Sequence, residues 1–171
     1  MTEHDMLHAP IYLQTAAYAR ENGERDQYRA SHLANVACRA AIDQAIRTHF
    51  DGMHLDRAAV QSVMKTFGAE RTLFVLANTV QQKSWDGRFS PDNKAWAATY
   101  AFPKSEIPGF DARDSFAATA HPAVLDGFIS LARIEAKRAR EKPSVKQQLH
   151  DAPQRTAVAP RQTRQTRSEV R

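Results

Sequence analysis

The chain has 171 residues, of which 42% are hydrophobic, which is enough for one domain with a sizeable core and excludes a wholly disordered protein. No run approaches the roughly 18 apolar residues of a membrane span, and "MTEHDMLHAP" lacks the basic and apolar regions of a secretory signal, so we expect a cytoplasmic protein. The net charge of +5 is uneven: residues 1–132 hold 13 Lys and Arg against 15 Asp and Glu (−2), whereas residues 133–171 hold 11 against 4 (+7).

Apolar residues at three- and four-residue steps predict a series of helices, with Pro, Gly and capping residues at their ends. The first is expected from Pro10 to a stop at Gly23, and a long second helix covers roughly residues 26–50. Asp56 is the expected N-cap of a third helix, which Gly68 closes.

The next segment, "AERTLFVLANTVQQK", has a centre that would also suit a buried strand. We favour a helix because the segment has 15 residues and begins with Glu70 near the positive end of the helix dipole. Ser90 and Pro91 predict the start of another helix, which ends before Pro103. A proline-containing loop then leads to a last helix that begins at about Pro122.

These patterns predict an all-α fold, a compact bundle of about five to six helices with a flexible basic C-terminal tail. Residues 1–9 are expected to be a flexible N-terminus and residues 10–135 the helical domain. Residues 136–171 are expected to form a charged extension of the last helix and a disordered basic tail, because few large apolar residues follow Pro143.

Side chains with catalytic or metal-binding chemistry are not arranged in a recognisable motif. Cys38 is the only cysteine and lies in a helical apolar pattern, where a buried structural thiol is expected. The pairs His4 and His8, and His49 and His54, have no third ligand placed near them. The sequence contains no GxGxxG, P-loop, GxSxG or HExxH motif. We therefore expect a non-enzymatic protein without a cofactor or metal.

The stretch "SWDGRFSPDNKAWA", residues 84–97, contains both tryptophans of the chain. Asp86-Gly87 predicts a tight turn between two helices, and this corner is expected to pack the rings of Trp85 and Trp96 against each other. Because Trp and Arg are favoured anchors at interfaces, polar residues near the corner are candidates for a partner-binding surface. The candidates are Asn78, Gln82, Lys83, Trp85, Arg88 and Asn93.

A purely local explanation of the same residues is the commoner situation in proteins. In that interpretation Arg88 pairs with Asp86 or Glu70, and Asn78 is a solvated or capping residue.

The basic residues near the C-terminus form a second candidate surface, because Lys and Arg side chains can contact the phosphates of nucleic acid. A tail that only improves solubility is the alternative. The candidates are Arg133, Lys137, Arg138, Arg140 and Lys142 on the last helix, followed by Arg155, Arg161, Arg164, Arg167 and Arg171.

Several stretches, among them "FDGMHL", "HPAVLDGFI" and above all the pattern "ERxxxVLANTVQxKxWDGRxS", resemble an uncharacterised bacterial family. Members of that family occur on integrative and conjugative elements and phage-like islands of gut bacteria. The resemblance covers most of residues 11–133, and "EKPSVKQQL" resembles a short tail element on other proteins of such elements. The family has no established catalytic residues.

The resemblance implies cargo of mobile DNA in a bacterial cytoplasm. The first hypothesis is a binding protein that docks on a host or element-encoded protein, for example to inhibit a host defence nuclease as anti-CRISPR proteins do. The second is a nucleic-acid-binding accessory protein for transfer or replication that uses the basic C-terminal arm. A third, a small-ligand sponge formed by pockets of an oligomer, stays open together with the oligomeric state.

Overall fold

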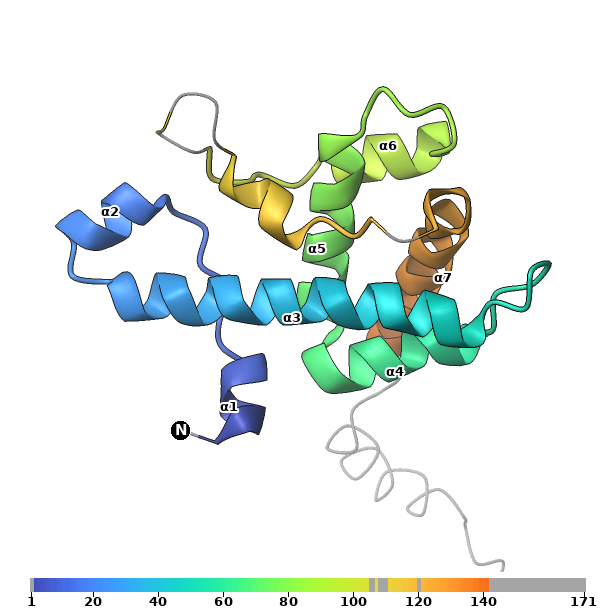
Figure 1. The fold of residues 1–171 in the computed structure, drawn as a ribbon, viewed down its shortest axis with the longest axis horizontal. Helices are drawn as coiled ribbons and strands as arrows, with labels where there is room; N and C mark the ends of the chain where they lie inside the picture. Colours follow the sequence, from blue (N-terminus) through green and yellow to red (C-terminus); the bar gives the residue numbers. More distant parts are fainter. Residues whose placement is uncertain (1, 105–106, 108–110, 120, 142–171) are drawn as a thin grey trace, which may run out of the picture. The chain divides into compact units, whose positions relative to one another are not determined.

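The computed structural model describes residues 2–104, 107, 111–119 and 121–141 (Figure 1). The chain divides into two units, Met1–Lys137 and Arg138–Arg171, and residues 138–141 are the only described part of the second. The elements, in chain order, are α1 (Glu3–Leu7), α2 (Ala16–Glu21), α3 (Arg25–His49), α4 (Arg57–Phe67), α5 (Ala69–Gln82), α6 (Pro91–Ala97), the 3₁₀ helix η1 (Ala112–Phe116) and α7 (Pro122–Glu141).

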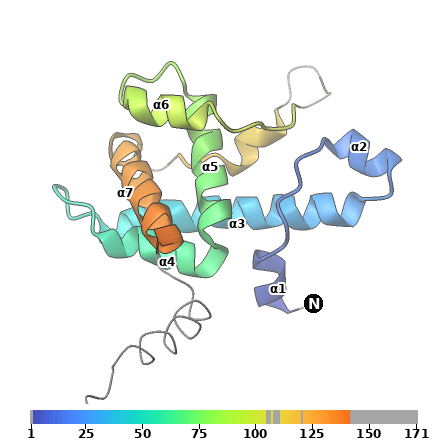
Figure 2. The ribbon, with the colours of Figure 1, turned by 180° about the vertical axis from the view of Figure 1, so that it is seen from behind.

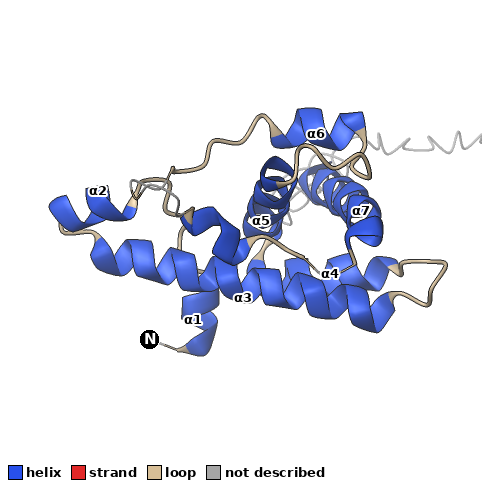
Figure 3. Ribbon diagram, turned by 45° about the horizontal axis from the view of Figure 1, so that its top comes forward, coloured by secondary structure: helices blue, strands red, loops and turns tan. Residues whose placement is uncertain are grey.

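The expected all-α fold is confirmed: the described residues form these helices and no strand, apart from one isolated antiparallel bridge between Phe50 and Leu55 (Figure 3). The segment "TLFVLA" lies in α5, which confirms the choice of helix over strand. None of the helices in the described part of the chain combines the length and apolar character needed to cross a bilayer. Most of the predicted tail lies outside the described residues.

Capping residues set the boundaries of α4 and α5 as the sequence indicates. The Asp56 carboxylate accepts a hydrogen bond from the Ala58 amide at 2.9 Å and begins α4. Gly68 both ends α4 and begins α5, with a φ of 83° and a ψ of 156°. Backbone with this φ and ψ is essentially restricted to glycine, so one residue turns the chain from one helix directly into the next.

Helix α5 forms the centre of the core. It crosses α3, and α6 lies at its far end (Figures 1 and 2). All ten side chains from Arg71 to Val80 are buried, so α5 has no solvent-facing stripe over this length. An all-round buried helix is packed on every side by other elements, here α3, α4, α6 and η1.

The N-terminal segment differs from its prediction. Instead of one helix from Pro10, α2 begins only at Ala16, because the Thr15 hydroxyl caps the Tyr18 amide. The preceding residues lie against α3: the Tyr12 amide donates to Ser31 Oγ at 2.9 Å, and its hydroxyl donates to Glu24 Oε2 at 2.7 Å. Residues 1–9, expected to be a flexible terminus, contain α1, whose start is closed by a reciprocal capping box.

The end of α6 and the residues of η1 also differ from the prediction. The Gln81 amide donates to the carbonyls of Ala97 and Tyr100, both at 2.8 Å. These bonds satisfy backbone carbonyls at the C-terminal end of α6, which is shorter than expected. The 3₁₀ helix after the proline-containing loop was not predicted. The Asp111 carboxylate starts it by accepting from the Arg113 amide at 3.1 Å.

Candidate functional site

Trp85 lies just beyond the C-terminus of α5, with 79% of the residue exposed to solvent. The last turn of α5 is closed before it by the Lys83 amide, which donates to the carbonyls of Thr79 and Val80, both at 3.2 Å. The predicted packing of the two tryptophan rings against each other is therefore wrong, because a ring held in such a contact would be largely buried.

A short ion pair holds the turn that presents Trp85. Asp86 is only 5% exposed and accepts from the Arg88 amide at 2.9 Å and from two guanidinium nitrogens, Nε at 3.0 Å and Nη2 at 2.7 Å. The Arg88 guanidinium, and then the Arg88 amide, lower the pKa of Asp86 to about 2. The local pairing of Arg88 with Asp86, expected as the alternative, is confirmed.

Phe89 anchors the same turn from the inside. Its side chain is 2% exposed and belongs to the hydrophobic core. The chain thus places one aromatic ring outward at Trp85 and another inward four residues later. The sequence did not identify Phe89, because a single aromatic residue in a turn has no local pattern that indicates whether its ring is buried.

Trp96 contacts Tyr100, just beyond the end of α6, and Arg133 of α7. Its ring meets the Tyr100 ring edge-on, with centroids 5.3 Å apart, and the Arg133 guanidinium lies 5.4 Å from the centroid of the Trp96 ring. A guanidinium over an indole face is a favourable cation–π arrangement. The charge of Arg133 is therefore engaged by a group of the domain itself, the Trp96 ring.

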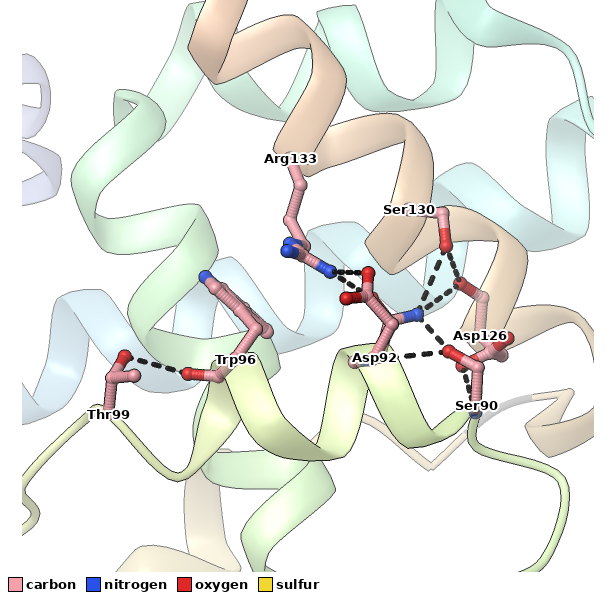
Figure 4. A network of polar contacts seen from close by, with 8 residues as sticks. Ser90, Asp92, Trp96, Thr99, Asp126, Ser130 and Arg133 are labelled. Carbon is pink, nitrogen blue, oxygen red and sulfur yellow. Dashed lines mark hydrogen bonds and ion pairs between the residues drawn. The ribbon is translucent and has the colours of Figure 1, made fainter.

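A polar network that includes Asp126, Ser130 and Arg133 connects α6 to α7 (Figure 4), and Asn93 of α6 bonds to all three. Asn93 is 1% exposed, and its amide nitrogen lies 2.8 Å from Asp126 Oδ1, 3.2 Å from the Asp126 carbonyl and 3.0 Å from Ser130 Oγ. Its amide oxygen accepts from Arg133 Nη1 at 2.8 Å. Ser90 caps α6 and donates its own amide to Asp126 Oδ1 at 2.9 Å. Asn93 is thus a buried connector and is not available on the surface proposed for partner binding.

Arg133, the first of the residues predicted to contact phosphate, also forms an ion pair with Asp92 at 2.7 Å. It therefore belongs to the same connection between α6 and α7. Lys137, Arg138 and Arg140 are exposed, the last two in the second unit of the chain. Lys142 and the arginines at 155, 161, 164, 167 and 171 lie outside the described residues.

Asn78 is also buried, with 0% of the residue exposed, so it cannot belong to an exposed patch. Its amide nitrogen donates to the Arg113 carbonyl at 2.9 Å. Gln82 is half-buried against η1; when its amide is oriented to satisfy both ends, it donates to Asp114 Oδ1 at 2.9 Å and accepts from Arg113 Nε at 3.1 Å. Both amides fix η1 to α5.

Three of the six predicted partner-binding residues remain together at the surface: Lys83, Trp85 and Arg88. We call these the Trp85 surface. Beside it a shallow groove runs between the end of α5 and α6, with Ser84, Lys94 and Tyr100 among its lining residues. Within the described ranges, no group of three or more His, Cys, Asp or Glu side chains is placed to hold a metal ion.

Cys38 is fully buried on α3, and burial raises the pKa of its thiol to about 12. This confirms the expected buried thiol. A thiol with so high a pKa is overwhelmingly protonated near neutral pH, and the thiolate is the nucleophilic form.

The fold and the Trp85 surface define a small all-α protein that presents a tryptophan beside a turn held by the Asp86–Arg88 ion pair. The sequence matches the family described as "Protein of unknown function (DUF3849)" over residues 11–137, and the chain belongs to this family. The predicted membership of an uncharacterised family is confirmed at that level. No curated protein matches the chain. No solved structure matches it either.

Proposed function

We propose that this protein is a non-enzymatic binding protein that docks on a partner protein through the Trp85 surface. The observation that supports the proposal is the 79% exposure of Trp85 on a turn that is otherwise firmly held. Tryptophan, together with tyrosine and arginine, is enriched among the residues that contribute most of the binding energy at protein interfaces.

Buried contacts hold the turn that follows Trp85 in the protein without a partner. Asp86 and Phe89, which follow Trp85 in the chain, are both buried, and the Asp86 carbonyl accepts from the Phe89 amide at 3.3 Å. Because the backbone around Trp85 is already ordered, binding costs little further conformational entropy.

The charges beside the ring favour a partner with an apolar pocket rimmed by carboxylates. Lys83 lies two residues before Trp85, and Arg88 has its side chain 53% exposed. Arg88 uses Nε and Nη2 for Asp86, and its Nη1 makes no hydrogen bond to a described residue. Nη1 and the Lys83 ammonium group are therefore the donors for acidic groups at the rim.

The biological setting of this proposal comes from the family resemblance. We propose that the partner is a host or element-encoded protein in the bacterial cytoplasm, such as a defence nuclease inhibited by occlusion, and that the gene is cargo of a mobile genetic element. This narrower proposal fails independently of the docking proposal if the partner has no role in defence.

Trp85→Ala is expected to weaken partner binding at least about 30-fold, corresponding to the 2 kcal/mol or more that defines an interface anchor. The free energy of unfolding is expected to change by less than about 0.5 kcal/mol, since the ring is exposed. The full-length tagged chain is used to recover partners from a bacterial host lysate, and the affinity of each purified partner is measured by calorimetry.

Met53→Ala is the matched control, because Met53 is 83% exposed and lies in the loop between α3 and α4. It is expected to leave the affinity unchanged. A partner that binds Trp85→Ala and the original protein equally well would contradict docking through this surface.

The exposed cations of α7 support nucleic-acid binding as a second candidate function. Lys137, Arg138 and Arg140 lie on its final turns, in the part of the chain with the +7 balance. Arg133 is excluded from this proposal because it is engaged with Asp92 and Asn93.

Replacing Lys137, Arg138 and Arg140 together by Gln in the full chain is expected to reduce the salt dependence of DNA binding. Each lost phosphate contact lowers the slope of log K against log salt by about 0.9, so three lost contacts lower it by about 2.7. Fluorescence anisotropy with a labelled duplex at several salt concentrations measures the slope. An unchanged slope would rule out these three residues as phosphate contacts.

A further inference from the structure

Helix α3 has an outward face that is separate from the Trp85 surface. In Figure 1 the helix lies in front of α5, and the segment that joins α1 to α2 passes behind it, as the view from the other side in Figure 2 confirms. The side of α3 that faces the viewer in Figure 1 is therefore open to solvent among the described elements.

The middle of this outward face is apolar. Leu33 is 54% exposed, Ala40 is also exposed, and Val36 and Ala37 are half-buried between them. These positions recur at steps of three and four residues, so they lie on one side of the helix. A leucine beside small side chains suits a second helix, because small residues let two helices approach closely.

Opposite charges lie towards the two ends of the same face. Asp26 lies seven residues before Leu33, and Arg47 lies seven residues after Ala40, and both charged residues are exposed. Seven residues are close to two helical turns, so the charges continue the line of the apolar side chains. None of the ion pairs found among the described residues involves Asp26 or Arg47.

A two-fold axis halfway between Leu33 and Ala40 makes this face complementary to itself. Two antiparallel copies of α3 then place Leu33 level with Ala40 of the second copy, so that a large side chain meets a small one. The same axis places Asp26 level with Arg47 of the second copy, so that opposite charges meet. Each contact occurs twice, because the interface is isologous.

Like charges disfavour the neighbouring registers of the two helices. A shift of three residues in one direction brings Arg29 level with Arg47 of the second copy. A shift of four residues in the other direction brings Asp26 level with Asp43 of the second copy. The charges thus select one register both by attraction in it and by repulsion in its neighbours.

We propose that two copies of this chain associate through the outward face of α3, antiparallel, around a two-fold axis between Val36 and Ala37. The pairing of Asp26 with Arg47 of the second copy sets the register, and the apolar middle of the face supplies buried area. Because the contact rests on one pair of helices, the association is reversible and depends on protein concentration.

Sedimentation velocity of the full-length protein at several concentrations in low salt measures the association. A reversible equilibrium between monomer and dimer is expected. Leu33→Asp removes the apolar contact twice and places two charges in the interface, so we expect it to weaken the dimer at least about tenfold. The variant is expected to keep the melting temperature of the original protein, because Leu33 is exposed in the single chain.

Charge reversal tests the register. Asp26→Arg and Arg47→Asp each set like charges against one another twice per dimer, and each is expected to weaken association about tenfold. The variant that combines both substitutions restores opposite charges, and its affinity is expected to lie within about threefold of the original. Lys65→Asp, on the exposed side of α4, is the matched control and is expected to leave association unchanged.

Three results would each overturn the proposal. They are a protein that stays monomeric up to about 1 mM, a dimer that Leu33→Asp leaves unchanged, and single charge reversals that the combined variant does not rescue. None of these results bears on docking through Trp85, since Trp85→Ala is expected to leave the dimer intact.

Discussion

Asn93→Ala is expected to lower the free energy of unfolding by about 3 kcal/mol. The substitution removes a fully buried amide and leaves the Asp126 carboxylate, Ser130 Oγ and Arg133 Nη1 without the partner that joins them. Each net hydrogen bond is worth about 1 kcal/mol, and the substitution removes the side-chain bonds to these three half-buried partners. Urea unfolding followed by circular dichroism measures the change.

Asn22→Ala provides the comparison for this prediction. Asn22 is exposed, and among the described residues its side chain donates to the Tyr18 carbonyl alone, at the end of α2. Its replacement is expected to cost less than about 1 kcal/mol. If Asn93→Ala cost no more than Asn22→Ala, the α6–α7 connection would not contribute to stability as described.

Phe89→Ala is expected to cost about 3–5 kcal/mol, the range for removing a buried aromatic side chain and leaving a cavity. Phe89 is among the largest fully buried side chains and fixes the chain immediately after the Asp86–Arg88 pair. The loss is expected in the same urea measurement.

Trp85→Ala is the matched variant, since it removes an aromatic residue four positions away from the same turn. The two variants are expected to change different quantities: Phe89→Ala lowers the free energy of unfolding, whereas Trp85→Ala lowers only partner affinity. Equal destabilisation by both would mean that the Trp85 ring contributes to folding despite its exposure.

The sequence was sufficient to predict the fold class and most helix boundaries, because these depend on local chemistry. The Asp56 and Ser90 caps and the Gly68 stop act within one helical turn, so the sequence contains the information. The helix of residues 10–23 was overestimated because the contacts of Tyr12 with Ser31 and Glu24 compete with helix formation. Such tertiary contacts leave no local sequence signal.

The candidate site was predicted only in part. Trp85, Lys83 and Arg88 are at the surface as expected, but Asn78 and Asn93 are buried. Polar residues on one helix face normally indicate solvent, and nothing in the sequence says that η1 covers Asn78 or that α7 covers Asn93. The buried amides serve to join helices, and only the three-dimensional structure identifies their partners.

The enclosure of α5 limits how this protein can change shape. A helix with every side chain from Arg71 to Val80 packed against a neighbour cannot slide or rotate by itself, since any shift would disturb several contacts at once. A conformational change that links distant surfaces would therefore have to leave α5 in place or unfold the whole domain. We therefore expect any regulation of this protein to act through molecules bound at the surface of the domain.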